Sequence, residues 1–256
     1  MEYLIVAALT IVASTLTGTV GVGGALVIVP ALTVAALNIG LLQPEIRLIG
    51  YAMNFISLAP IVFKHRKTID YSLAKPLIVF SVIGAFIGAN IPAFIDEKIL
   101  LSCFVATLLV IILLLVKKMY DKTQTVKNFQ HNYRNWLAIS LIGMIVGLAS
   151  GLFGIGGGVF MLPLVIIFIG VKPKSIILVT PLVVLFSTGT GIMVSLWNNI
   201  WLQNTAVAVI VILSALVGAE LGDKLRGKMS DRMLQWVIVM VLLILTVKLG
   251  MKVVAM

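Results

Sequence analysis

The chain has 256 residues, of which 61% are hydrophobic and only 11% are charged. A soluble domain carries about 25% charged residues, and much of its surface must face water. The composition therefore excludes a water-soluble globular domain and favours an integral membrane protein. The net charge of +10 does not indicate nucleic acid as a partner, because Lys and Arg gather in short loops beside apolar segments, as the positive-inside rule describes.

Six apolar runs have about the length needed to cross a hydrocarbon core of about 30 Å as helices. They comprise residues 46–63, 72–95, 100–116, 175–196, 205–221 and 233–247. We therefore expect an all-α protein with several membrane-spanning helices.

Two further apolar stretches, 3–37 and 136–169, are too long for one straight helix, and each contains glycines near its middle. In the first stretch the arms on either side of the glycines are the segments 3–17 and 25–37. Helices of that length reach only about 20–22 Å. Arm length therefore favours a re-entrant hairpin, although a pair of short full spans fits the charge pattern equally well.

The two glycine breaks match each other at one constant offset along the sequence. The matching residues are Gly18, Gly21, Gly23, Gly24 and Pro30 in the first break and Gly151, Gly154, Gly156, Gly157 and Pro163 in the second. Farther along, Gly88-Ala89 aligns with Gly218-Ala219. We therefore predict two repeats, residues 1–117 and 135–256, joined by a basic cytoplasmic linker at 118–134.

Loop charge predicts how the two repeats are oriented. If each glycine segment crosses the membrane once, the 19 Lys and Arg residues divide 11 to 8 between the two sides. If each glycine segment returns to its starting side, the division becomes 15 to 4. The positive-inside rule favours the second arrangement, which inverts one repeat relative to the other and places both termini outside.

The glycine breaks are candidate substrate sites because each leads into a new helix, at Ala25 or Val159. A helix N-terminus offers unpaired N–H groups and about half a positive charge, and glycine lets an anion approach the backbone closely. Broken helices of inverted repeats hold the substrate near the midplane in many carriers. We expect a small anion to be bound by Thr17, Gly18, Thr19, Gly21, Gly23, Gly24, Asn54, Ser150, Gly151, Gly154, Gly156, Gly157, Gly158, Thr180 and Ser187, with Pro30, Pro163 and Pro181 as hinge residues.

Each of these assignments has a structural alternative. Glycines in membrane helices also serve close helix packing. Hydroxyl groups within the spans also bond to another helix or to the carbonyl four residues back in their own helix. The same alternatives apply to the neighbouring polar residues Ser14, Thr15, Ser57, Thr188 and Thr190.

Catalytic and metal-binding patterns are absent from the sequence. His65 and His131 have no partner at metal-ligand or catalytic-triad spacing, and the single cysteine, Cys103, lies in an apolar run. We therefore expect no enzyme activity, no metal and no cofactor.

The segment from Gly154 to Pro163, with its weaker first copy from Gly21 to Pro30, resembles the sulfite exporter TauE/SafE family of membrane permeases, also called TSUP. The pair of sequences at 84–89 and 214–219 resembles this family too. The resemblance implies transport of small sulfur-containing anions such as sulfite or an organosulfonate, across a bacterial-type cell membrane. It leaves open which anion is carried, and whether it is imported or exported.

A secondary carrier is the function that we expect, with an anion channel of the same architecture or a carrier of a non-sulfur organic anion as alternatives. The expected partners are the small anionic substrate and the lipid bilayer. The sequence allows a homodimer, and it leaves open whether a proton or sodium is the coupling ion.

Overall fold

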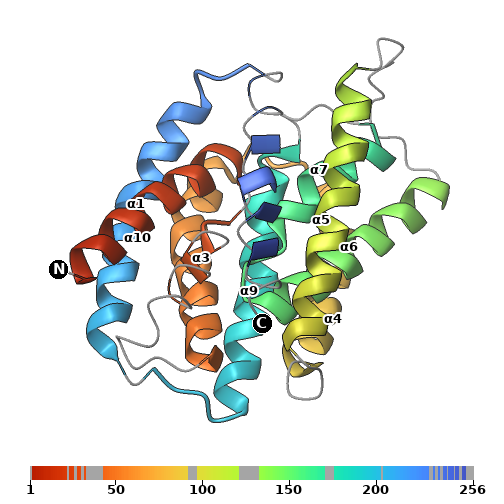
Figure 1. The fold of residues 1–256 in the computed structure, drawn as a ribbon. Helices are drawn as coiled ribbons and strands as arrows, with labels where there is room; N and C mark the ends of the chain where they lie inside the picture. Colours follow the sequence, from red (N-terminus) through yellow and green to blue (C-terminus); the bar gives the residue numbers. More distant parts are fainter. Residues whose placement is uncertain are drawn as a thin grey trace.

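The structure is a computed structural model that describes residues 2–21, 23–25, 28–29, 32, 43–91, 97–120, 133–170, 176–202 and 204–230, together with scattered positions between 233 and 251. The described elements are all helices, which agrees with the expected all-α membrane protein. Figure 1 shows their arrangement. In chain order they are α1 (Glu2–Val20), α3 (Gln43–His65), α4 (Tyr71–Asn90), α5 (Glu97–Tyr120), α6 (Tyr133–Phe153), α7 (Gly158–Phe168), α9 (Val179–Trp197) and α10 (Thr205–Arg226).

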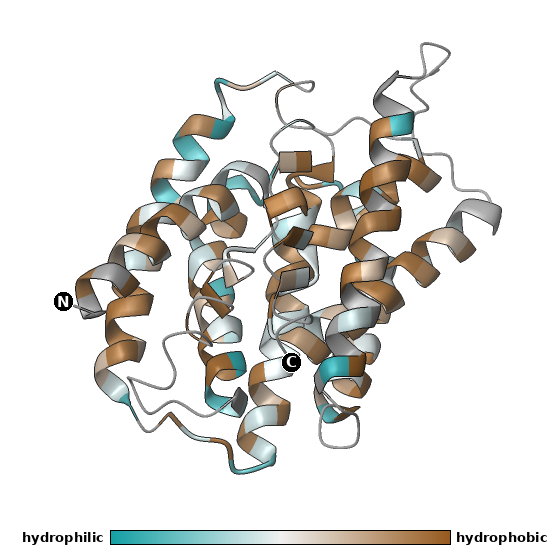
Figure 2. Ribbon diagram, viewed as in Figure 1, coloured by the Kyte–Doolittle hydropathy of each residue, from teal (hydrophilic) through white to brown (hydrophobic). Residues whose placement is uncertain are grey.

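Five helices in the described part of the chain are long and apolar enough to cross a membrane: Pro44–His65, Tyr71–Asn90, Trp136–Phe153, Val179–Trp197 and Thr205–Arg226. Four of them cover expected spans, and α5 covers the expected span at 100–116. Hydrophobic residues predominate along these helices, while hydrophilic residues gather mainly near helix ends and in the connections (Figure 2). The last expected span, 233–247, falls on a stretch that is described only at scattered positions.

The second glycine break has arms of unequal length, whereas the expected arm at 25–37 after the first break lies mostly outside the described residues. The first arms are longer than expected, since α1 has 19 residues and α6 has 21. At 1.5 Å per residue these helices reach about 28 Å and 31 Å. The arm after the second break, α7, has 11 residues and reaches only about 17 Å. The arm-length argument for a hairpin therefore holds for α7 but not for α1 or α6.

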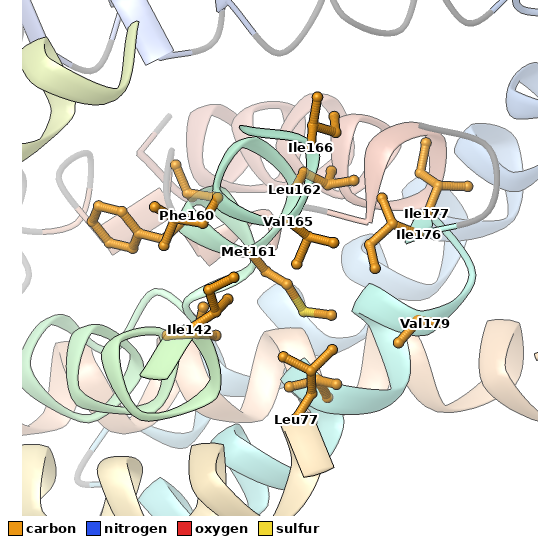
Figure 3. Packing of buried hydrophobic residues seen from close by; sticks show 14 of the residues in the cluster. Leu77, Ile142, Phe160, Met161, Leu162, Val165, Ile166, Ile176, Ile177 and Val179 are labelled. Atoms are coloured by element: carbon orange, nitrogen blue, oxygen red, sulfur yellow. The ribbon is translucent and has the colours of Figure 1, made fainter. Parts of the chain in front are cut away.

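The short helix α7 is enclosed by protein. Every residue from Gly158 to Ile166 is buried. Figure 3 shows Phe160, Met161 and Val165 of α7 among apolar side chains of α4, α6 and α9. Because α7 is too short to span a bilayer by itself, it depends on this packing within the protein.

Helices from the two halves of the chain pair reciprocally. The two most extensive helix contacts join α1 to α10 and α4 to α6, so each half supplies one helix to each pair. Between these pairs, α3 of the first half packs against α9 of the second. Glycines make both close contacts, because a Cβ added to Gly218 would meet the Ile11 carbonyl and one added to Gly84 would meet the Met144 carbonyl.

These glycine contacts show which residues of α4 and α10 occupy equivalent positions in the two halves. Gly88 meets the Leu148 carbonyl as Gly222 meets the Thr15 carbonyl. The helix caps have the same spacing, since the side chains of Asp70 and Asn204 accept hydrogen bonds from the first turns of α4 and α10. Gly84-Ala85 therefore corresponds to Gly218-Ala219, and the structure shifts the sequence alignment of Gly88-Ala89 by one helical turn. Both helices contain Gly-Ala-x-x-Gly, so a match that uses only one glycine can slip by one turn.

The C-terminal ends of α3 and α10 are joined by a cluster of charges. The carboxylate of Asp223 lies 2.7 Å from Lys64 Nζ and 3.0 Å from His65 Nε2, and it also pairs with Arg226 on its own helix. Asp223 and Arg226 are both buried. The basic residues that end α3 and those that end α10 therefore lie on the same side of the molecule.

The opposite pair of helix ends is uncharged. Asn198, which follows α9, donates a hydrogen bond from Nδ2 to Oδ1 of Asn90 at the end of α4, at 3.4 Å. The bundle is thus held by an ionic cluster where α3 meets α10 and by an amide contact where α4 meets α9.

Replacing Gly88 by alanine is expected to destabilise the protein by about 1–3 kcal/mol, because the new Cβ overlaps the Leu148 carbonyl and α4 must move away from α6. Thermal unfolding of the detergent-solubilised protein measures the loss. Gly250→Ala is the control, since a Cβ there meets nothing within 4 Å. Equal unfolding temperatures for the two variants would contradict the close contact.

Replacing Asp223 by alanine is expected to cost about 3 kcal/mol, because it leaves Arg226 buried without its counter-charge. Glu220→Ala is the matched control on the same helix. Glu220 is half exposed and its pairs with Lys64 and Lys224 are 3.6 and 3.7 Å long, so its loss should cost less than about 1 kcal/mol. The same unfolding assay compares them, and a larger effect of the Glu220 variant would count against the buried cluster.

Candidate functional site

The backbone turns in the same way in both glycine loops. After α1, Gly21 and Gly23 have φ values of 75° and 96°, and after α6, Gly154 and Gly156 have 72° and 84°. Positive φ is strained for residues with a side chain, which explains glycine at these four positions. The second loop contains a third glycine with a positive φ, since Gly157, with φ 64°, is the N-cap residue of α7.

The two loops meet beside Asn54 of α3. A Cβ added to Gly23 would lie 2.8 Å from the carbonyl oxygen of Ile155 in the other loop and 3.2 Å from Asn54 Nδ2. A Cβ added to Gly156 would lie 2.5 Å from the same nitrogen. The structure therefore brings together three of the residues selected from the sequence, one from each glycine break and one from α3.

Asn54 holds one loop and leaves a donor facing the other. Its side chain is completely buried, and its Oδ1 accepts a hydrogen bond from the backbone N–H of Ala25 at 3.2 Å. Because the atom that accepts from an N–H must be the oxygen, the opposite atom is the amide nitrogen. This Nδ2 has no hydrogen-bond partner within the described structure. An unpaired buried donor costs about 1–3 kcal/mol, so the arrangement is suited to an added acceptor.

The end of α7 adds a second source of hydrogen-bond donors. Gly157 provides no side-chain cap, and the first N–H groups of a helix have no partner inside it. The helix dipole adds partial positive charge at this end. Asn54 Nδ2 lies against Gly156, one residue before this cap, so this side-chain donor lies close to the N-terminus of α7.

Most hydroxyl groups among the candidates already donate to the backbone carbonyl four residues before them. Thr17 donates to the Ala13 carbonyl at 3.1 Å, Thr19 to Thr15 at 2.7 Å and Thr180 to Ile176 at 3.0 Å. Thr15, Thr188 and Thr190 form similar bonds. Their protons are therefore unavailable to an anion in this conformation.

The remaining serine hydroxyls differ from one another. Ser150 donates to Ser187 at 3.2 Å, and Ser187 donates to the Val184 carbonyl at 3.0 Å. Ser14 and Ser57 are completely buried, and their oxygens have no hydrogen-bond partner in the described structure. Ser14 faces Gly218 in the contact between α1 and α10, whereas Ser57 follows Asn54 on α3.

Other selected glycines lie farther from Asn54. Added Cβ atoms at Gly18 and Gly151 would meet the backbone of α10 and of α4, respectively, so both serve helix packing. Gly24 lies against Thr17 and Met53, and Gly158 is the first residue of α7. Gly21 lies against the Ile177 carbonyl and the ring of Pro181.

The prolines occupy three different situations. Pro163 is buried in the middle of α7. Pro181 lies in the first turn of α9, where its missing N–H breaks no hydrogen bond within that helix. Pro30 lies outside the described residues.

Tyr51 contacts the second loop from α3 and was not selected from the sequence. Its hydroxyl donates to the Gly151 carbonyl, and its ring packs on Gly191 of α9. In a continuous helix that carbonyl would accept from residue 155, but the chain turns away at Gly154. Tyr51 therefore caps the end of α6. Its position three residues before Asn54, on the same helix face, is the signal that could have identified it.

Tyr51→Phe is expected to destabilise the protein by about 1–3 kcal/mol, because it leaves a buried carbonyl without a donor. Tyr71→Phe is the matched control, since the Tyr71 hydroxyl donates to the Arg66 carbonyl in an exposed position. Thermal unfolding should separate the two variants. A smaller effect at Tyr51 than at Tyr71 would contradict its capping role.

Comparisons with known proteins agree with the resemblance read from the glycine motifs. The family model described as "Sulfite exporter TauE/SafE" matches residues 6–249. The chain is 26% identical to "Probable membrane transporter protein YunE" of Bacillus subtilis, covering 98% of the chain and 96% of that protein. It is 24% identical to "Probable membrane transporter protein MJ0441" of Methanocaldococcus jannaschii, covering 91% of each, and 28% identical to "Probable membrane transporter protein YjnA" of Bacillus subtilis, covering 91% and 94%.

No solved structure matches the chain significantly. The family match nevertheless extends over nearly all of the sequence and includes both glycine loops. The chain is therefore a multi-pass membrane protein that belongs to the sulfite exporter TauE/SafE family of transporters.

Proposed function

We propose that the chain is a secondary carrier for a small anion, which binds where the two glycine loops meet at Asn54. Sulfite, another sulfur oxyanion or an organosulfonate is the class to test first, because the family description names sulfite. The relatives are named only as membrane transporters, so they do not narrow the choice.

The unpaired amide N–H of Asn54 carries the proposal. It is completely buried, faces Gly156 and lies beside the N-terminus of α7, whose dipole favours negative charge. An anion placed here would accept from both the side chain and the backbone. Asn54 and the glycines supply neutral donors, which suits a carrier because the anion must also leave.

The proposal includes an inverted orientation of the two halves. If each glycine segment crossed once, the basic residues ending α3 and those ending α10 would lie on opposite sides of the membrane. The 2.7 Å contact between Lys64 and Asp223 instead supports a common side. By the positive-inside rule that side is the cytoplasm, with both termini outside a bacterial-type cell membrane.

The reciprocal pairing of α1 with α10 and α4 with α6 supports a carrier. In carriers built from inverted repeats, one bundle rocks against the other around a fixed central site. An anion channel of the same architecture is the alternative. Purified protein in proteoliposomes discriminates the two, since saturable sulfite uptake that is accelerated by internal sulfite indicates a carrier, whereas non-saturating flux without counterflow would contradict it.

Gly156→Ala is expected to abolish sulfite uptake, because its Cβ would occupy space beside Asn54 Nδ2. Gly170→Ala is the matched control. Gly170 has a similarly positive φ of 79°, so the backbone strain of about 1–2 kcal/mol is the same, but a Cβ there meets nothing within 4 Å. Uptake should be retained in the control. Full uptake by the Gly156 variant, at equal amounts of folded protein, would rule out the site.

A further inference from the structure

The two halves of the chain are not equivalent at the centre of the molecule. Gly21 and Gly154 correspond in the two loops, and they meet Ile177, just before α9, and Arg47 of α3, respectively. Arg47 and Ile177 are therefore matching positions in the two halves. Seven residues farther along the chain from each, the same register matches Asn54 with Val184, and ten residues farther it matches Ser57 with Ser187.

In each of these three matched pairs of positions, the polar or unpaired group lies on α3. Arg47 matches the apolar Ile177, and Asn54 matches the apolar Val184, which is also completely buried. Ser57 has no hydrogen-bond partner within the described structure, whereas Ser187 is engaged by Ser150 and by the Val184 carbonyl. At these positions, the side-chain donors left free for a ligand therefore belong to the first half.

The backbone that the free Asn54 donor faces belongs to the second half of the chain. Asn54 Nδ2 faces Gly156, just before the N-terminus of α7. The first loop already has its hydrogen bond to Asn54, because the Ala25 N–H donates to Asn54 Oδ1. Asn54 thus fixes the first loop with its oxygen and presents its nitrogen to the second.

We propose that the anion binds off the axis that relates the two halves, between α3 and the N-terminus of α7, and that Asn54 and Ser57 are its side-chain ligands. This inference rests on the proposed function and adds to it. The α9 side, with Val184 and Ser187, forms the wall of the site and does not bind the anion. Arg47, two turns from Asn54 on the same helix, provides positive charge along the approach from the α3 N-terminus.

Two matched serine variants test this asymmetry. Binding of radiolabelled sulfite and of methanesulfonate to the purified full-length protein is measured for the wild type, Ser57→Ala and Ser187→Ala. Loss of one hydrogen bond to a charged ligand should weaken binding at least about tenfold for Ser57→Ala. Ser187→Ala should change it less than about twofold, because that hydroxyl is engaged within the protein.

Asn54→Asp provides the sharper test of the second ligand. It keeps the shape and the oxygen that accepts from Ala25, but replaces the free N–H with a negatively charged oxygen. Binding of both anions should be lost while the thermal unfolding temperature shows that the protein is folded. Asn54→Val is a second variant for this test, and we expect it to raise the transport KM for sulfite with a smaller change in Vmax.

The outcomes separate this inference from the proposed function. Equal weakening by Ser57→Ala and Ser187→Ala would overturn the off-axis site, while saturable binding by the wild type would leave the carrier intact. Tight binding by folded Asn54→Asp would also overturn the assignment of Asn54. Absence of wild-type binding for both sulfite and methanesulfonate would overturn the anion site and the proposed carrier together.

Discussion

Backbone that is not helical is tolerated at membrane depth only where it is buried in protein or lines a water-filled cavity, because lipid offers no hydrogen bonds. The two glycine loops depend on this condition. The carbonyl of Gly151, released by the turn at Gly154, accepts from Tyr51, and the N–H of Ala25 donates to Asn54. Both supporting residues lie on α3, so one helix supplies polar partners to the breaks in both halves.

Reciprocal helix pairing holds α3 in position for this role. The pairs α1–α10 and α4–α6 form through backbone contacts at glycines such as Gly84, Gly88, Gly218 and Gly222, which let the helices approach closely. The α1–α10 pair packs against α3, the α4–α6 pair packs against α9, and α3 and α9 pack against each other between the two pairs. The same small residues that bring the halves together therefore also bring the two loops to a common point.

The two glycine loops resemble each other in backbone conformation but differ in the side chains that surround them. The backbone φ values are similar at the matched positions Gly21 and Gly154, and Gly23 and Gly156. The side chains around the loops differ, because Asn54 is matched by Val184. A duplicated backbone suits alternating access from two sides, whereas a single anion needs only one set of ligands. In the proposed site, the divergence at α3 would provide that one set without disturbing the shared framework.

The amino-acid sequence was sufficient for the membrane class, the positions of most helices and the matching glycine breaks, because hydropathy and glycine spacing are local properties. It also selected Gly23, Asn54 and Gly156, which the fold brings together. The sequence could not show that Thr17, Thr19 and Thr180 donate their protons to the carbonyls four residues before them, or that Gly18 and Gly151 serve helix packing. Those distinctions, the capping role of Tyr51 and the joining of Lys64 to Asp223 depend on contacts between residues far apart in the chain, and only the packing of the helices decides them.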